Sequence, residues 1–126
     1  GGFMYLHKEL VDEPGASFGL VGAIDAKVYK GDRLENFGYQ ELVPLAESQL
    51  FNPSEPLKAH EYHYWQSEEP GSDFLARKAW LGKEWNTAHA RGVLYAGFPQ
   101  IYLLSSPQLV ANFISAMKIY SESLQK

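Results

Sequence analysis

The chain has 126 residues, no cysteine and a formal net charge of −4, with 45% hydrophobic and 21% charged residues. This composition excludes disulfides and a cysteine nucleophile within the chain, and it argues against a nucleic-acid surface, which needs clustered lysine and arginine. No apolar run is long enough to span a membrane and no signal peptide is recognisable, so we expect one cytoplasmic domain, residues 1–126, without membrane or nucleic-acid partners.

The first half of the chain shows helical spacing near its start and strand-like apolar runs after it. The spacing of residues 3–11 predicts a helix with one apolar side, made up of Phe3, Met4, His7, Leu10 and Val11. The later runs are short and bounded by turn residues, which is typical of strands. The remaining predictions are a turn at 12–15, a buried strand at 20–24 continuing to 29, a turn at 30–32, a strand at 34–45 with a bulge or close backbone approach at Gly38, and a loop at 52–56.

The second half contains the stretch that is densest in polar and aromatic groups, Leu-Lys-Ala-His-Glu-Tyr-His-Tyr-Trp at 57–65, which predicts a strand. Residues 73–85 are ambiguous and compatible with a helical turn and a hairpin, and 92–98 predict another strand. Ser106 as N-cap and Pro107 at the first helical position predict a C-terminal helix. We expect its apolar stripe to lie in the core; the stripe consists of Leu109, Val110, Phe113, Ile114, Met117 and Leu124. Strands between two terminal helices predict an α/β or α+β domain with a mixed sheet.

His60, Glu61 and His63 raise the possibility of a metal site. Histidines three residues apart point to opposite faces of a strand, and no cysteine is present, so we expect no metal. Instead, we expect one of His60 and Glu61 to point into the sheet interface with a hydrogen-bond partner. The aromatic residues nearby are open to two interpretations, a ligand platform or ordinary packing, of which we favour packing. They are Tyr62, Tyr64, Trp65, Trp80 and Trp85.

Four segments together resemble the cobyrinic acid a,c-diamide synthase family. Gly-Gly-Phe-Met-Tyr-Leu at 1–6 is similar to the residues that follow the family's nucleophilic cysteine. Arg-Leu-Glu-Asn-Phe-Gly-Tyr at 33–39 resembles its Arg-Leu-x-x-Phe-Gly-Tyr, and Ala-His-Glu-Tyr-His-Tyr at 59–64 resembles its Gly-His-Glu-Phe-His-Tyr. Residues 92–107 lie where the family has Gly-x-x-x-Ala-Ser-Tyr-x-His-x-His, then Ser-Asn-Pro and a terminal helix. Order and spacing agree over the whole chain.

The resemblance implies a flavodoxin-like α/β fold of the class I-type glutamine amidotransferase kind. This chain would be the C-terminal portion of that domain, truncated so that the N-terminal strands are missing. The family is an amide-forming ligase of cobalamin biosynthesis, which amidates a cobyrinate corrinoid with ammonia from glutamine; a relative amidates nickel sirohydrochlorin, and the sequence does not separate the two. ATP and magnesium serve the parent enzyme, with no cofactor expected in this chain. An unpaired sheet edge implies a partner, either the N-terminal ATP-binding domain or a second copy in a homo-oligomer.

The resemblance also locates candidate site residues and shows where the pattern fails. Gly1 and Gly2 stand where the family has an oxyanion-binding N–H, and His60, Glu61 and His63 would border the glutamine site.

The cysteine would precede Gly1, and the family's two histidines fall on Gln100 and Tyr102. Because an amide is not a base near neutral pH, we expect no intact catalytic set. A fragment whose glutaminase chemistry is lost or relocated and a non-catalytic binding or interaction module stay open as alternatives.

Overall fold

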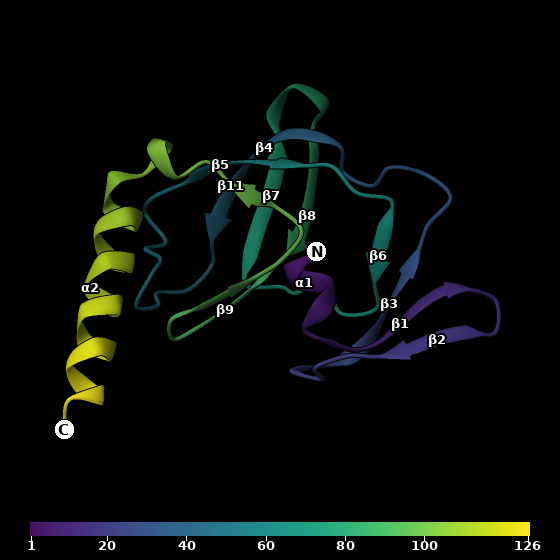
Figure 1. Cartoon of the computed structure of the whole chain (residues 1–126). Helices are drawn as coiled ribbons and strands as arrows, with labels where there is room; N and C mark the ends of the chain where they lie inside the picture. The colour runs from purple at the N-terminus through teal and green to yellow at the C-terminus, as the bar shows by residue number, and fades with distance from the viewer.

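The computed structural model covers residues 1–126, with two α-helices, two 3₁₀ turns and eleven strands in three sheets (Figure 1). A four-stranded sheet lies at one end, the C-terminal helix at the other, and a five-stranded sheet between them. The helices and strands are α1 (Gly2–Tyr5), β1 (His7–Glu13), β2 (Ala16–Gly19), β3 (Ile24–Lys30), β4 (Gly38–Pro44), β5 (Leu57–Glu61), β6 (Trp65–Ser67), β7 (Phe74–Lys78), β8 (Lys83–Thr87), β9 (His89–Arg91), β10 (Leu94–Ala96), β11 (Gln100–Ile101) and α2 (Pro107–Leu124).

The four-stranded sheet has the order β2-β1-β3-β6 and is mixed, since β1 runs parallel to β3 while the other pairs are antiparallel. Its first hairpin turns at Pro14 and Gly15, where the glycine has a φ of 82°. Positive φ costs a glycine little because it has no Cβ. The turn predicted at 12–15 is therefore present, although its first two residues continue β1.

The five-stranded sheet has the order β11-β5-β4-β7-β8 and is antiparallel throughout. Alternation buries one face of each central strand, as with Leu42 in β4 and Phe74 in β7, both with no exposed surface. The loop after β4 adds Phe51, whose ring meets that of Phe74 edge-on at 4.9 Å. The core of the domain therefore lies on the inner face of this sheet, and its members are Leu42, Leu50, Phe51, Leu57, Ala59, Phe74, Ala76, Ala88 and Leu109.

Two linkers join the sheets and contact each other. Residues 31–37 lead from β3 to β4, and residues 62–64 lead from β5 to β6. The Gly31 N–H donates to the Tyr64 carbonyl at 2.8 Å, and the Glu35 N–H donates to the His63 carbonyl at 3.2 Å. The strand predicted at 57–65 is thus divided between β5 and β6, which belong to different sheets. His60 lies in β5, whereas His63 lies in the linker between the two strands.

The helix predicted at 3–11 is wrong beyond its first turn. α1 ends at Tyr5 and the chain continues as β1, which pairs with a strand on each side. The ladder bonds on both sides outweigh the weak helical spacing, and they place His7, with no exposed surface, inside the sheet. The buried strand predicted at 20–24 and continuing to 29 is right only from Ile24, where β3 begins. Residues 20–23 are irregular, and Val21 is exposed.

Other local predictions are confirmed. Residues 73–85 form a hairpin of β7 and β8 around a 3₁₀ turn at Ala79–Leu81, and the loop at 52–56 is present. The strand predicted at 34–45 is the shorter β4, and the one at 92–98 is the shorter β10. Gly38 begins β4 with a φ of 107° and no register shift, close to the Lys78 ammonium, so it marks a close approach rather than a bulge.

The C-terminal helix begins as predicted, since the Ser106 hydroxyl accepts the Leu109 N–H at 3.2 Å and Pro107 opens the first turn. The prediction that its apolar stripe lies in the core is wrong. Leu109 is buried, but Phe113 and Met117 are about half exposed, at 52% and 55%. The helix meets the domain through a neighbouring side, where Asn112 donates to the Leu50 carbonyl at 3.0 Å.

The fold class agrees with the prediction. The chain is α/β, with mixed and antiparallel sheets and few helices, and it is compatible with a flavodoxin-like amidotransferase fragment. Neither α-helix combines the length and apolarity needed to cross a membrane.

Candidate functional site

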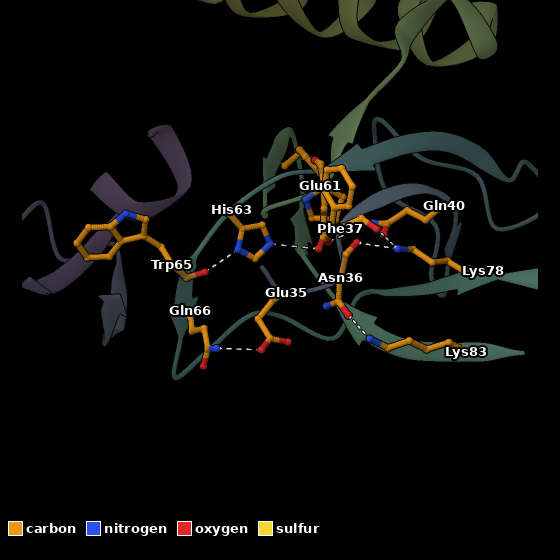
Figure 2. Close-up of polar contacts among 12 residues, drawn as sticks. Glu35, Asn36, Phe37, Gln40, Glu61, His63, Trp65, Gln66, Lys78 and Lys83 are labelled. Carbon is orange, nitrogen blue, oxygen red and sulfur yellow. Dashed lines mark hydrogen bonds and ion pairs between the residues drawn. The ribbon is translucent and has the colours of Figure 1, made fainter. Parts of the chain in front are cut away.

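The most enclosed polar group of the candidate site is the Glu61 carboxylate at the end of β5. Its side chain is 1% exposed. Alternation along β5 turns it to the inner face of the sheet, beside the amide of Gln40 from β4. Gln40 Nε2 donates to Glu61 Oε1 at 3.1 Å, and His63 Nε2 lies 3.2 Å from the other oxygen (Figure 2). The sequence prediction that one of His60 and Glu61 points inward and is hydrogen-bonded is confirmed for Glu61.

The His63 ring is held on both edges and one face. Nδ1 lies 2.6 Å from the Trp65 carbonyl, and the ring stacks on Phe98 with centroids 3.8 Å apart and planes 9° apart. Both nitrogens therefore face oxygen acceptors. Both ring nitrogens are thus already engaged by protein oxygens, and neither is free to accept a proton from a substrate.

A loop closes over this pair from the side of β4. The Lys78 ammonium donates to the Asn36 carbonyl at 3.0 Å and to the Phe37 carbonyl, while Lys83 donates to the Asn36 side-chain oxygen at 2.7 Å (Figure 2). Burial lowers the pKa of Lys78, and the positive charge of Lys83 lowers it further. Asn36 has a φ of 47°, which asparagine tolerates better than most residues. The two lysines therefore hold the loop 31–37 in place.

A cavity of about 220 Å³ adjoins the His63–Glu61 pair. Its lining is mostly polar and comes from both sheets and both linkers: Glu35, Asn36, Glu61, His63, Gln66, Ser67, Pro70, Trp85, Asn86, Thr87 and Phe98. The Trp85 side chain contributes to this lining, while its indole N–H is itself buried without a hydrogen-bond partner. The polar lining suits a polar ligand.

His60 points to the opposite face of the sheet. It borders an open hollow of about 550 Å³ together with Gln100, which is its register partner across β5 and β11. The His60 ring meets those of Tyr39 and Phe37 edge-on, at 4.9 and 5.8 Å. Tyr102 lines the same hollow. The structure therefore brings His60 to Gln100 and separates both from Glu61 and His63.

Gly1 and Gly2 lie at the exposed start of α1, where Gly1 is the N-cap. The helix is anchored by Phe3, whose ring meets that of Phe98 edge-on at 4.8 Å. Phe98 thus contacts both α1 and His63. The oxyanion role of the two glycines stays a prediction.

Several contributors were missed by sequence reasoning. Gln40 and Lys78 are polar residues at buried strand positions, and only the pairing of β4 with β5 and β7 places them beside Glu61 and the loop. His7 was assigned to a helix face, but its Nε2 lies 2.6 Å from the Ser67 hydroxyl inside the four-stranded sheet. No group of three or more histidine, aspartate and glutamate side chains is arranged to hold a metal ion.

The four segments that carry the resemblance meet in one place. Phe3 represents the first segment, Glu35 the second, His63 the third and Phe98 the fourth. They are linked by the Phe3–Phe98 contact, the His63–Phe98 stack and the hydrogen bond from Glu35 to the His63 carbonyl. Segments far apart in sequence therefore form one site around His63.

No family model matches the chain. Among curated proteins it is similar to the cobyrinate a,c-diamide synthases of Caldanaerobacter subterraneus subsp. tengcongensis, at 28% identity over 90% of this chain and 26% of that protein, and of Salmonella typhimurium, at 27% identity over 94% and 27%. A synthase from Saccharolobus solfataricus is 35% identical over 50% of this chain and 14% of its own length. The chain spans about a quarter of the first two. The resemblance to this family found in the sequence is thereby confirmed.

Proposed function

We propose that this chain is the C-terminal portion of the glutamine amidotransferase part of an ATP-dependent enzyme like cobyrinate a,c-diamide synthase, and that the glutaminase residues are missing from it. The proposal rests on the family of the relatives, which are named for amidation of cobyrinate. Cobyrinate as acceptor, glutamine as nitrogen source and the cytoplasm as location belong to the proposal.

The observation that carries the proposal is the convergence of the four segments on the His63–Phe98 stack. Segments retained only for folding would be scattered through the core. Three of these segments instead line a mostly polar cavity with a buried carboxylate, and the first contacts that lining through Phe3 and Phe98. Buried polar groups demand exact partners, so such a cluster is typical of a ligand site or of its remains.

The local chemistry supports the loss of glutamine hydrolysis. Attack on an amide needs a thiolate or an equivalent nucleophile and a base to move the proton. Gln100 offers no base, and both nitrogens of His63 are already engaged. His60 is the imidazole nearest Gln100, and it has no hydrogen-bond partner to orient it as a base. The chain by itself therefore lacks the pair of groups that the reaction requires.

The residues present do not fit ATP with magnesium. The chain has no carboxylate cluster arranged for a metal ion and no glycine-rich phosphate loop. The ATP-dependent chemistry therefore belongs, in this proposal, to the remainder of a synthase-length polypeptide.

The second candidate is a non-catalytic module that binds a ligand. It is favoured by the mostly polar cavity beside His63. Both candidates predict no release of glutamate from glutamine by the purified chain, and they differ in what happens inside a complete enzyme.

The test is a hybrid protein in which this chain replaces the matching stretch of the Caldanaerobacter synthase. We expect ammonia to support diamide formation and glutamine not to do so. Changing Gln100→His should restore glutamine-supported synthesis, whereas Gln125→His, a matched change at the exposed C-terminus, should not. Ammonia-supported synthesis shows that the hybrid is folded. Glutamine-supported synthesis in the unchanged hybrid, or no rescue by Gln100→His, would contradict the proposal.

A further inference from the structure

His7 differs from the other histidines in what its second ring nitrogen faces. Its Nδ1 lies 2.9 Å from the Phe3 carbonyl, and its Nε2 lies 2.6 Å from the Ser67 hydroxyl. A carbonyl oxygen can only accept, so in the neutral ring the proton is on Nδ1, and Nε2 is a basic nitrogen that accepts from the hydroxyl. Of the four histidines in the chain, it is the only one that is hydrogen-bonded to a hydroxyl.

The Ser67 hydroxyl is held from two sides by groups that the fold brings together. It donates to His7 Nε2 and accepts the Glu69 N–H at 2.9 Å. A hydroxyl has one proton and two lone pairs, so one lone pair of Ser67 is left without a partner. The serine comes from β6 and the histidine from β1, which lie in the same sheet. A hydroxyl whose proton is directed at an oriented imidazole is the arrangement of an activated nucleophile.

This pair opens onto the polar cavity described above. Ser67 is partly exposed and is one of the residues that line the cavity of about 220 Å³. His7 has no exposed surface, so a small molecule can reach the pair only from the side of the serine. Asn86 lines the same cavity, and its side-chain amide makes no hydrogen bond within the chain. That amide can donate to a carbonyl oxygen on which negative charge develops.

We propose that Ser67 and His7 form a nucleophile–base pair that hydrolyses short, uncharged carboxylic esters. His7 Nε2 takes the hydroxyl proton as Ser67 Oγ bonds to the ester carbonyl carbon, and it returns that proton to the departing alcohol, which leaves an acyl group on the serine. Water then gives a proton to His7 as its oxygen bonds to the acyl carbon. The released serine oxygen takes that proton back, and the carboxylic acid departs. The inference is independent of the proposed function.

The surroundings of the pair favour esters over amides. The Phe3 carbonyl orients His7 but carries no charge to balance the imidazolium, whereas a catalytic triad supplies a carboxylate for this purpose. An amine must be protonated before it can leave, and an alcohol or phenol depends less on that proton. The pair therefore suits esters, and glutamine, which is a primary amide, lies beyond its reach.

The cavity also limits the acyl group. Its volume of about 220 Å³ is below the roughly 300–1,000 Å³ that is typical of sites for drug-sized ligands, so we expect a short acyl group. The buried Glu61 carboxylate belongs to the same lining and repels an anionic acyl group. The substrate class is therefore a short, uncharged ester.

Reaction of the full chain with p-nitrophenyl acetate tests the proposal. We expect release of p-nitrophenol and, after a brief incubation, an acetyl group on Ser67 in peptide mass spectrometry. Ser67→Ala should abolish both signals, whereas Ser17→Ala, at an exposed serine on β2 of the same sheet, should preserve them. His7→Gln, which can still form a hydrogen bond but is not basic, should slow acetylation by about a hundredfold or more. His60→Gln, on the other sheet, should leave the rate unchanged.

The acetylated residue is identified in the unchanged chain, so this result does not depend on whether a variant folds, which circular dichroism shows. Absence of acetyl from Ser67, acetyl groups on lysines alone, or a folded His7→Gln variant as reactive as the parent would overturn the proposal. p-Nitrophenyl hemisuccinate, which has the same leaving group and an anionic acyl group, should react more slowly than the acetate. Equal rates for the two esters would contradict the substrate class.

Discussion

Replacing Glu61 tests whether the site around His63 depends on its buried carboxylate. Glu61→Leu removes the acceptor for two buried groups, the Gln40 amide and the His63 ring. Glu61→Gln keeps the shape of the side chain and can satisfy both, because its oxygen accepts from Gln40 and its amide donates to a neutral imidazole. The two variants therefore separate loss of charge from loss of hydrogen bonding.

The magnitudes follow from the burial of the carboxylate. Breaking one side of a buried hydrogen-bonded charge pair costs about 3–5 kcal/mol, and each orphaned buried polar group costs about 1–3 kcal/mol. We expect Glu61→Leu to lower the free energy of unfolding by about 3–5 kcal/mol. Glu61→Gln should cost less than about 1 kcal/mol, since no group is left unpaired.

Urea unfolding followed by tryptophan fluorescence measures both variants, since Trp65 and Trp85 lie beside the site. Nitrogen NMR of His63 adds a readout that does not depend on stability. In Glu61→Gln the His63 ring should carry a single N–H, directed at the Trp65 carbonyl, and its other nitrogen should accept from the new amide. Equal destabilisation by Leu and Gln, or a Leu variant as stable as the parent, would refute the reasoning.

Three further changes test the fold. The Tyr95 hydroxyl donates to the Pro99 carbonyl, and burial raises its pKa. Its contribution to the free energy of unfolding is therefore complete below the unfolded pKa of about 10 and is lost as the pH rises beyond that value. In urea titrations, Tyr95→Phe should lower the free energy of unfolding by about 1 kcal/mol at neutral pH and should lose less stability than the parent at alkaline pH. Gly71→Ala should prevent folding as judged by circular dichroism, because its φ is 91° and a Cβ would lie 2.2 Å from backbone, whereas Gly15→Ala, with open space at φ 82°, should cost about 1 kcal/mol. Ser106→Ala should remove the helix cap at about 1 kcal/mol, and Ser115→Ala, exposed in mid-helix, should not destabilise the chain in the same thermal melts.

Local sequence signals were sufficient where short-range chemistry decides the structure. The cap of α2 at Ser106 and the prolines at 53 and 56 act through their own backbone geometry, so their effects were predicted from the sequence. The hairpin at 73–85 also depends on neighbours in the chain, and its sequence was compatible with this structure although ambiguous. The family resemblance also identified the candidate site, because it singled out four segments that lie far apart in the sequence and come together only in the folded chain.

Long-range pairing was the part that the sequence could not supply. Residues 7–11 became a strand because β2 and β3 lie on either side, which no local pattern records. Gln40 and Lys78 lie at the site only because β4 pairs with β5 and β7 in this register. The stripe on α2 predicted burial, but a sequence pattern does not show which surface covers a helix, so Phe113 and Met117 were wrongly placed in the core.

The touching linkers 31–37 and 62–64 make the two sheets one cooperative unit. Neither sheet can detach without parting the bonds from Gly31 to Tyr64 and from Glu35 to the His63 carbonyl. In native-state hydrogen exchange, the amides of Gly31 and Glu35 should therefore open only with the whole molecule, although both sit in irregular segments that would ordinarily exchange early. The His63 ring is thus held at the contact between the two sheets, where any separation of the sheets would begin.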